Sequence, residues 1–235
     1  MRVLITRPAE DAEALGQALT RLGHEVLAAP LLEIEQVRGA DLNLAGVQAL
    51  VVTSANGVRA FAARSLVRTL AVYCVGDATA RQARELGFQT VESANGDVCA
   101  LARLVTEKCA PGDGALLHPA GSRLAGDLAA RVHRAGFEYR RAVLYSATRA
   151  TALPRTAHAA LVAGHVDGVV LFSPRTGQTF ARLVDLAGVG KHLKAVNAYC
   201  LSPAVASTID TLSWQTVCVA AHPDQASLLA LLDTC

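Results

Sequence analysis

Short, uninterrupted apolar runs alternate with amphipathic stretches along the whole chain, and no other feature constrains its fold as strongly. The runs span residues 3–5, 50–52, 71–75, 115–117, 169–172, 198–201 and 217–221. Runs this short are typical of parallel strands that are covered on both faces. The stretches between them have one apolar face, as the helical spacing of two residue sets shows: Ala12, Leu15, Leu19 and Leu22, and Leu124, Leu128, Val132 and Ala135. The sequence therefore predicts an α/β protein with parallel sheets.

Capping residues predict where several of these helices begin and end. Polar residues of the N-cap type precede four apolar-periodic stretches, at Asp77, Asp97, Ser122 and Asp224. Ser173-Pro174 and Ser202-Pro203 each place a proline at the first helical position. Glycines follow three predicted helices, at Gly23, Gly87 and Gly136.

The chain repeats itself, and the order of the repeats predicts two interleaved domains. Residues 52–54 and the predicted helix after them resemble residues 171–173 and the predicted helix that follows those. Residues 23–26 likewise resemble residues 136–139. We expect a discontinuous α/β domain from 1–33 plus 149–235 and an inserted domain from 41–139, each with a five-stranded sheet. Residues 34–40 and 140–148 would then form a two-stranded linker, with a cleft between the domains.

Composition excludes several classes of protein. The net charge is +2, which is not the basic surplus of a general nucleic-acid binder, and aromatic residues make up only 4%. No uncharged apolar stretch reaches 18 residues, so we expect no membrane span, and the N-terminus has no apolar segment of signal-peptide length.

Of the 22 basic residues only Lys108, Lys191 and Lys194 are lysines. Two interpretations stay open: a GC-rich genome, or a need for planar guanidinium groups that bind carboxylate or phosphate.

The six cysteines show no metal-binding spacing. They are Cys74, Cys99, Cys109, Cys200, Cys218 and Cys235. None forms a CxxC pair, and Cys74, Cys200 and Cys218 lie inside apolar runs. We expect buried thiols of a cytoplasmic protein, and no metal or cofactor.

Candidate binding residues follow the predicted strands, because open parallel sheets bind ligands beyond the carboxyl ends of their strands. Helix N-termini at these positions favour anions. The candidates are Arg7, Thr53, Ser54, Gly76, Thr79, His118, Ser173, Arg175 and Ser202. The serines are either helix caps alone or caps that also bind, and His118 either contacts the ligand or has a solvated or capping role.

Several familiar sites are missing. Ser54 is not in a GxSxG elbow, so it is not expected to be a nucleophile. The sequence contains neither GxGxxG after its first strand nor GxxxxGK[ST], which argues against enzymes that use NAD or nucleoside triphosphates.

Tyr145, in the second linker, is the candidate catalytic residue, since a phenol can donate a hydrogen bond to a leaving hydroxyl. The alternative is a tyrosine that packs on the linker.

The order and spacing of several motifs resemble the uroporphyrinogen-III synthase family over nearly the whole chain. These motifs occupy residues 3–8, 30–34, 52–58, 75–80, 136–145, 172–174 and 200–203. The resemblance implies two flavodoxin-like domains joined by a two-stranded linker. It also implies an enzyme, a lyase that needs no cofactor and closes hydroxymethylbilane to uroporphyrinogen III with inversion of ring D and loss of water.

The resemblance assigns roles to individual residues. Tyr145 matches the family's cleft tyrosine and would assist loss of the hydroxyl, while Thr53, Ser54, Thr79 and Ser173 match positions that contact the tetrapyrrole. Some family members carry two threonines where Ala204 and Val205 stand here, which puts side-chain hydrogen bonding at that loop in doubt. The arginines at 7, 149 and 175 are candidates to meet the eight carboxylates of the substrate.

The expected partners follow from the resemblance and from composition. The resemblance implies a linear tetrapyrrole substrate, and we expect possible transient contact with hydroxymethylbilane synthase. From composition we expect no nucleic acid, no membrane, a cytoplasmic location and, because little apolar surface is expected to be exposed, a monomer. The main alternative is a non-enzymatic hinged protein that binds or senses a small molecule. A sugar- or phosphate-handling α/β enzyme is a weaker alternative, because it would need a base or metal-ligand cluster that the sequence does not offer.

Overall fold

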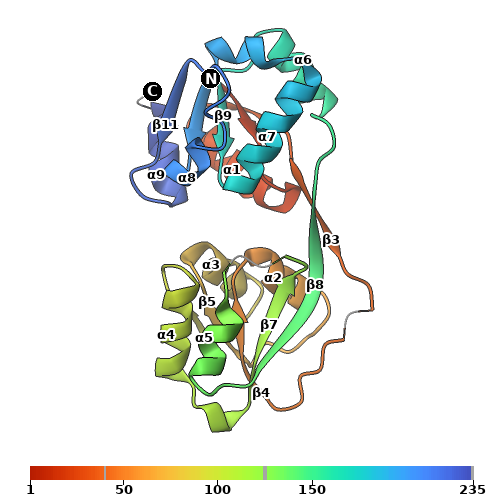
Figure 1. The fold of residues 1–235 in the computed structure, drawn as a ribbon, viewed down its shortest axis with the longest axis vertical. Coiled ribbons are helices and arrows are strands. Elements are labelled where there is room, and N and C mark those ends of the chain that lie inside the picture. Colours follow the sequence, from red (N-terminus) through yellow and green to blue (C-terminus); the bar gives the residue numbers. More distant parts are fainter. Residues whose placement is uncertain (40, 124–125, 234–235) are drawn as a thin grey trace. The chain divides into compact units, whose positions relative to one another are not determined.

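The chain forms two compact units (Figure 1). The structure, a computed structural model, describes residues 1–39, 41–123 and 126–233. Unit 1 comprises Met1–Glu33 and Thr148–Cys235, and unit 2 comprises Ile34–Ala147. The chain therefore leaves unit 1 after residue 33 and returns to it at residue 148.

Unit 1 is built on a five-stranded parallel sheet of order β11-β10-β9-β1-β2. Its strands are β1 (Arg2–Ile5), β2 (Glu25–Ala28), β9 (Gly168–Leu171), β10 (Asn197–Cys200) and β11 (Thr216–Val219). One face packs against α1 (Ala9–Arg21) and α9 (Gln225–Ala230). The other packs against α6 (Arg155–Val162), α7 (Pro174–Ala187) and α8 (Pro203–Ala206). Two 3₁₀ turns, Gly190–Ala195 and Leu231–Asp233, complete this unit.

Unit 2 carries a six-stranded sheet of order β3-β8-β7-β4-β5-β6. Its strands are β3 (Leu32–Gln36), β4 (Val47–Val52), β5 (Ala71–Cys74), β6 (Val91–Ser93), β7 (Ala115–Gly121) and β8 (Tyr139–Arg149). One face packs against α2 (Ala55–Ala62) and α3 (Asp77–Glu85). The other packs against α4 (Val98–Lys108) and α5 (Leu128–Arg134). A 3₁₀ turn at Pro111–Asp113 precedes β7.

Strands β3 and β8 both cross the boundary between the units. They run in opposite directions, because the amide of Val37 donates to the carbonyl of Leu144 and the amide of Ala150 donates to that of Leu31. The prediction of a five-stranded sheet confined to 41–139 was wrong. Only four strands lie wholly within that range, and β8 begins at Tyr139, pairs in parallel with β7 on one side and pairs with β3 on the other.

The apolar runs are continuous because both faces of each sheet are covered. Val3, Leu4 and Ile5 are all fully buried, although their side chains alternate between the two faces. The predicted α/β fold with mainly parallel sheets is confirmed. The predicted place of Leu22 on the apolar face of α1 was wrong, because Leu22 lies beyond the end of that helix and is 46% exposed. Leu124, predicted on another helix face, falls outside the described residues.

Most predicted caps are confirmed, and two were wrong. Asp97 and Asp224 cap α4 and α9 through their carboxylates, and Gly23 has the positive φ (81°) of a residue that ends a helix. The N-cap of α3 is Gly76, so Asp77 is its first helical residue, where a carboxylate still favours the positive end of the helix dipole. Helix α5 begins only at Leu128, capped by Asp127 rather than by Ser122, because β7 continues to Gly121.

The cysteine prediction is correct for two of its three buried thiols. Cys74 and Cys200 are buried and free, and burial raises the pKa of each thiol to about 12. Cys218 is buried but forms a disulfide, so the expectation of a free thiol was wrong there. It lies in β11, the edge strand of the unit 1 sheet.

Candidate active-site residues at the two sheet edges

Each sheet has one point where the order of its strands reverses. In unit 1 this point lies between β1 and β9, and in unit 2 it lies between β4 and β7. The connections leaving neighbouring strands there go to opposite faces of the sheet, which opens a crevice beyond their carboxyl ends. The residues that follow these four strands are therefore the first candidates for ligand contact.

Arg7 follows β1 at the reversal point of unit 1. Its guanidinium lies 4.5 Å from the centroid of the Phe172 ring, and its Nη2 lies 3.0 Å from a carboxylate oxygen of Asp11. Stacking and the ion pair hold this cation in one orientation on the first turn of α1. Asp11 and Phe172 were not among the predicted site residues. The four-residue spacing of Arg7 and Asp11 was a usable signal for the ion pair.

The other predicted residues of unit 1 lie at the starts of two helices. Ser173 caps α7, where its Oγ accepts a hydrogen bond from the amide of Thr176 (3.2 Å) and lies 2.8 Å from that residue's hydroxyl. Arg175 is half-buried on the first turn of α7, and its carbonyl accepts a bond from Thr179. Ser202 is the N-cap of α8, but its side chain makes no capping bond; its carbonyl accepts from the amide of Val205 instead.

Three predicted residues of unit 2 lie at the starts of α2 and α3. Ser54 caps α2 by accepting from the amide of Asn56 (3.2 Å). Gly76 is the extended N-cap of α3, and a Cβ added there would meet no atom within 4 Å, so the backbone faces open space. Thr79 is 6% exposed, and its amide donates to the carbonyl of Gly76. Serine and glycine thus leave the backbone of this edge accessible.

His118 lies inside β7, not beyond its end as predicted. Strand β7 pairs with β4 only as far as Leu117, because Pro119 has no amide hydrogen and the start of α2 lies close to its carbonyl at Gly57. His118 is 1% exposed, with Nε2 at 3.0 Å from Thr53 Oγ1 and Nδ1 at 2.6 Å from the hydroxyl of Tyr139. Burial, helped by the charge of Arg141, lowers the pKa of His118 to about 4, so the ring is neutral at pH 7.

A β-bulge in β8 directs Tyr145. The register runs from Leu116 opposite Tyr139 to Ala120 opposite Val143, and then places Gly121 opposite Tyr145, so β8 contains one extra residue. In a regular strand Tyr145 would lie on the opposite face from Leu144. Because of the bulge, both residues pack on the face covered by α2 and α3.

Gly121 provides the space that the ring of Tyr145 occupies. A Cβ at residue 121 would lie 2.9 Å from two carbons of that ring and 3.2 Å from its hydroxyl oxygen. Tyr145 is half-buried, and its hydroxyl forms no hydrogen bond with any residue that the structure describes. A positioned phenol without a protein partner is suited to donate a hydrogen bond to a ligand.

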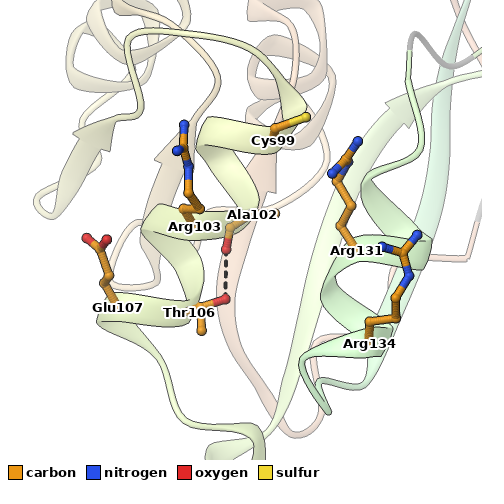
Figure 2. A pocket seen from close by; sticks show the side chains of 7 residues that line it. All are labelled: Cys99, Ala102, Arg103, Thr106, Glu107, Arg131 and Arg134. Atoms are coloured by element: carbon orange, nitrogen blue, oxygen red, sulfur yellow. Dashed lines mark hydrogen bonds between the residues drawn. The ribbon is translucent and has the colours of Figure 1, made fainter.

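A basic groove lies elsewhere in unit 2, between α4 and α5 (Figure 2). It has a volume of about 510 Å³ and is lined by Cys99, Ala102, Arg103, Thr106, Glu107, Arg131 and Arg134. Figure 2 shows the side chains of Arg103 and Arg131 pointing the same way from the two helices. The hydroxyl of Thr106 donates to the carbonyl of Ala102, so it is occupied within α4. None of the predicted site residues lines this groove, and it belongs to the helix layer rather than to the reversal point.

Across residues 1–39, 41–123 and 126–233, no three His, Cys, Asp or Glu side chains come together as metal ligands. None of the helices in that part of the chain has the length and hydropathy needed to span a membrane.

The chain matches a family model described as uroporphyrinogen-III synthase HemD over residues 13–230. The uroporphyrinogen-III synthetase of Helicobacter pylori is similar in fold, with a TM-score of 0.67 at 14% identity over 100% of this chain and 99% of that one. A mutant uroporphyrinogen III synthase of Thermus thermophilus gives 0.53 at 17% identity over 99% and 97%. No match was found among curated proteins. At 14% and 17% identity the solved structures support the fold alone. The family model covers most of the sequence, and the chain therefore belongs to the uroporphyrinogen-III synthase family.

Proposed function

We propose that the protein is a uroporphyrinogen-III synthase, a lyase that closes hydroxymethylbilane to uroporphyrinogen III with inversion of ring D and release of water. The observation that carries the proposal is the family match over residues 13–230. Nothing in the comparisons supports the alternative of a hinged binding or sensing protein.

The fold proposed with this function is a pair of flavodoxin-like domains joined by a two-stranded linker. The strand order of unit 1 supports it: numbered along that unit's own strands it is 2-1-3-4-5, the flavodoxin order. The paired strands β3 and β8, which contain both boundaries between the units, support the linker. We propose domains of 1–33 plus 149–235 and 41–139 on this basis, and we place candidate substrate-binding residues at the carboxyl edge of each sheet.

The substrate carries eight carboxylates, and the two edges offer two kinds of partner for them. Arg7 supplies a fixed positive charge, and Arg149 and Arg175 are further candidates in unit 1. The first turns of α2, α3 and α7 supply amide hydrogens beside Ser54, Gly76 and Ser173. Such groups bind anions without a large net charge, in agreement with the value of +2.

Tyr145 is proposed as the catalytic residue. Loss of the hydroxymethyl oxygen as water leaves an azafulvenium cation, and a phenol that donates a hydrogen bond to that oxygen stabilises the departing group. The substituted carbon of ring D, as the nucleophile, attacks the methylene carbon of the cation and forms a spiro intermediate. The spiro intermediate fragments and recloses with ring D inverted, and loss of the proton from the ring carbon at the new bond returns the proton that left with the water. The remaining task of the protein is to hold the bilane in one geometry, which is catalysis by positioning.

A coupled assay tests the function. Porphobilinogen and its deaminase generate hydroxymethylbilane in place, this protein is added, and the oxidised porphyrin isomers are separated by chromatography. We expect the type III isomer to dominate; type I alone, with the deaminase active, would contradict the proposal. Tyr145→Phe should lower turnover more than product affinity, with Tyr73→Phe, at a buried tyrosine on β5, as the control.

The setting of the enzyme is proposed with it. We propose a cytoplasmic monomer that acts without metal or cofactor, takes its substrate in transient contact with hydroxymethylbilane synthase, and binds neither nucleic acid nor membrane. Sedimentation of the purified protein tests the monomer, and a shift in sedimentation on adding the deaminase tests the contact.

A further inference from the structure

Three side chains form a hydrogen-bonded chain across the middle of the unit 2 sheet. Thr53 follows β4, His118 lies in β7 and Tyr139 begins β8. The distances are 3.0 Å from Thr53 Oγ1 to His118 Nε2 and 2.6 Å from His118 Nδ1 to the Tyr139 hydroxyl. The ring of Tyr139 also meets the ring edges of His118 and His133, each at a centroid distance of 5.9 Å. The hydrogen-bonded chain therefore runs from the half-buried Tyr139 through the buried His118 to Thr53 at the reversal point.

His118 is neutral, so it carries one N–H for two partners. Burial disfavours its charged form, and Arg141, the charged group that acts on it, disfavours that form further. Burial likewise raises the pKa of Tyr139 to about 12, so this phenol keeps its proton. Two arrangements are then available, which differ in the nitrogen that carries the proton of the imidazole.

The distances distinguish the two arrangements. A separation of 2.6 Å is shorter than the usual range of an N–H donor and lies within the range of an O–H donor. The distance therefore favours Tyr139 as the donor to Nδ1, which leaves the proton of the imidazole on Nε2. The 3.0 Å to Thr53 Oγ1 is typical of an N–H···O bond, so His118 donates and Thr53 accepts.

The consequence appears at Thr53. Its oxygen accepts from His118, so its own proton needs a different acceptor, and no residue among those described provides one. In the opposite arrangement Thr53 would donate to Nε2 and would present only lone pairs to a ligand. Lone pairs repel a carboxylate, whereas a free O–H binds it.

We propose that Tyr139 and His118 are positioning residues that turn Thr53 into a hydrogen-bond donor toward a substrate carboxylate at the carboxyl edge of the unit 2 sheet. This inference rests on the proposed function for the identity of the carboxylate. The arrangement of protons within the chain does not depend on that function and can be measured separately.

The first measurement is NMR of the protein labelled with ¹⁵N-histidine, with His118→Gln used to assign the signals. We expect the Nε2–H tautomer for His118. Tyr139→Phe removes the donor to Nδ1 and should shift the ring toward a mixture of tautomers, while Tyr73→Phe should leave it unchanged. An Nδ1–H tautomer in the unmodified protein would overturn the inference.

The second measurement is steady-state kinetics in the coupled assay. Thr53→Val, which removes the donor, should raise KM about tenfold with little change in kcat, as expected for loss of a hydrogen bond to a charged group. Thr53→Ser should restore most of the affinity. An Nε2–H tautomer in a protein that forms no type III isomer would refute the function and leave the proton arrangement standing. Full activity with unchanged KM in Thr53→Val would refute the role of Thr53 alone.

Discussion

Each sheet reverses its strand order beside one strand, β1 in unit 1 and β4 in unit 2, but the residues at the two reversal points differ in chemistry. In unit 1 the threonine that follows β1 is fully buried, and its hydroxyl donates to the carbonyl of Val170 (2.8 Å). The neighbouring Arg7 contacts Phe172 and Asp11. In unit 2 the threonine that follows β4 is half-buried and bonded to a neutral histidine.

Under the proposed function, the difference predicts two ways to bind a substrate carboxylate. In unit 1 the candidate is a formal charge, that of Arg7, held by Asp11 and by stacking on Phe172. In unit 2 the candidates are neutral dipoles, since the charged Arg141 donates to the carbonyls of Gly121 and Ser122. Charge attracts from a distance and is screened by salt, whereas neutral hydrogen bonds are short-ranged and less affected by salt.

The largest expected effect is the loss of stability when a Cβ is added to a closely packed glycine in each unit. Gly57 in α2 approaches the carbonyl of Pro119 so closely that a Cβ cannot fit without moving backbone. Gly57→Ala should lower the free energy of unfolding of unit 2 by about 3 kcal/mol. Gly177→Ala in α7 meets the side chain of Thr208, which can rotate, and should cost unit 1 about 1 kcal/mol.

Urea denaturation measures both changes. The single tryptophan, Trp214, stacks on Phe180 in unit 1, so its fluorescence follows that unit, while circular dichroism follows both. Gly16→Ala is the control, because its Cβ meets only ordinary contacts at 3.6 Å or more. Equal shifts of fluorescence and circular dichroism in Gly57→Ala would mean that the units do not unfold separately.

The next effect is a pH dependence confined to unit 2. The pKa of His118 is about 4 in the folded protein against 6.5 in the unfolded chain, so the unfolded chain binds more protons between these values. Stability from this residue is complete above pH 6.5 and falls as the pH is lowered, by about 2.5 kcal/mol at pH 4.5. Urea titrations at pH 7 and 4.5 should show this loss by circular dichroism.

Unit 1 provides the contrast in the same titrations. The carboxyl pKa values of Glu25 and Asp224 are lowered by hydrogen bonds from Arg2 and from the amide of Ser227, so their contributions are lost only at more acid pH. The transition followed by Trp214 should therefore change less between pH 7 and 4.5. A pH slope that persists in His118→Gln would assign the effect to another group.

A smaller effect separates the two modes of binding. Arg7→Gln should raise KM for hydroxymethylbilane about tenfold and flatten its dependence on ionic strength, because the screened charge is gone. Thr53→Val should raise KM while leaving the salt dependence as it is. Arg21→Gln removes the same charge from the exposed last turn of α1 and is the control. Identical salt slopes for Arg7→Gln and the unmodified protein would show that Arg7 does not meet a carboxylate.

The smallest effect concerns the two capping serines. Ser54→Ala and Ser173→Ala each remove a bond to a helix amide and should lower the free energy of unfolding by about 1 kcal/mol. The loss should appear in circular dichroism alone for Ser54 and in fluorescence for Ser173. A loss below the experimental error at either site would mean that water replaces the cap.

The sequence carried enough information to predict the fold class and most helix starts. Runs such as residues 3–5 are apolar throughout because both faces of the sheet are covered, and this is a local signal. The six-stranded sheet of unit 2 was not predictable in the same way. The pairing of β3 with β8 joins residues about 110 positions apart and depends on contacts that no local pattern records.

The candidate site shows the same limit. Ser54 and Ser173 were identifiable from their place before apolar helices, and the Ser-Pro pair at 173–174 strengthened the second. The burial of His118 was not identifiable, because it depends on β7 extending past its apolar run to Gly121 and on Tyr139 arriving from the next strand. The orientation of Tyr145 depends on a register shift that leaves no mark in the composition of β8.

The extra residue in β8 affects how related chains can vary. Loops usually tolerate the gain or loss of one residue, and a strand core usually tolerates exchange of one apolar residue for another. If all residues of β8 were kept but paired regularly, the phenol of Tyr145 would move to the opposite face of the sheet, whereas deleting Leu144 would remove the bulge and leave Tyr145 opposite Gly121, on the face that it shares with Ala142. A relative that lacks the bulge would have one residue fewer in this strand. An alignment by residue count alone would then match Tyr145 to the wrong position in that relative.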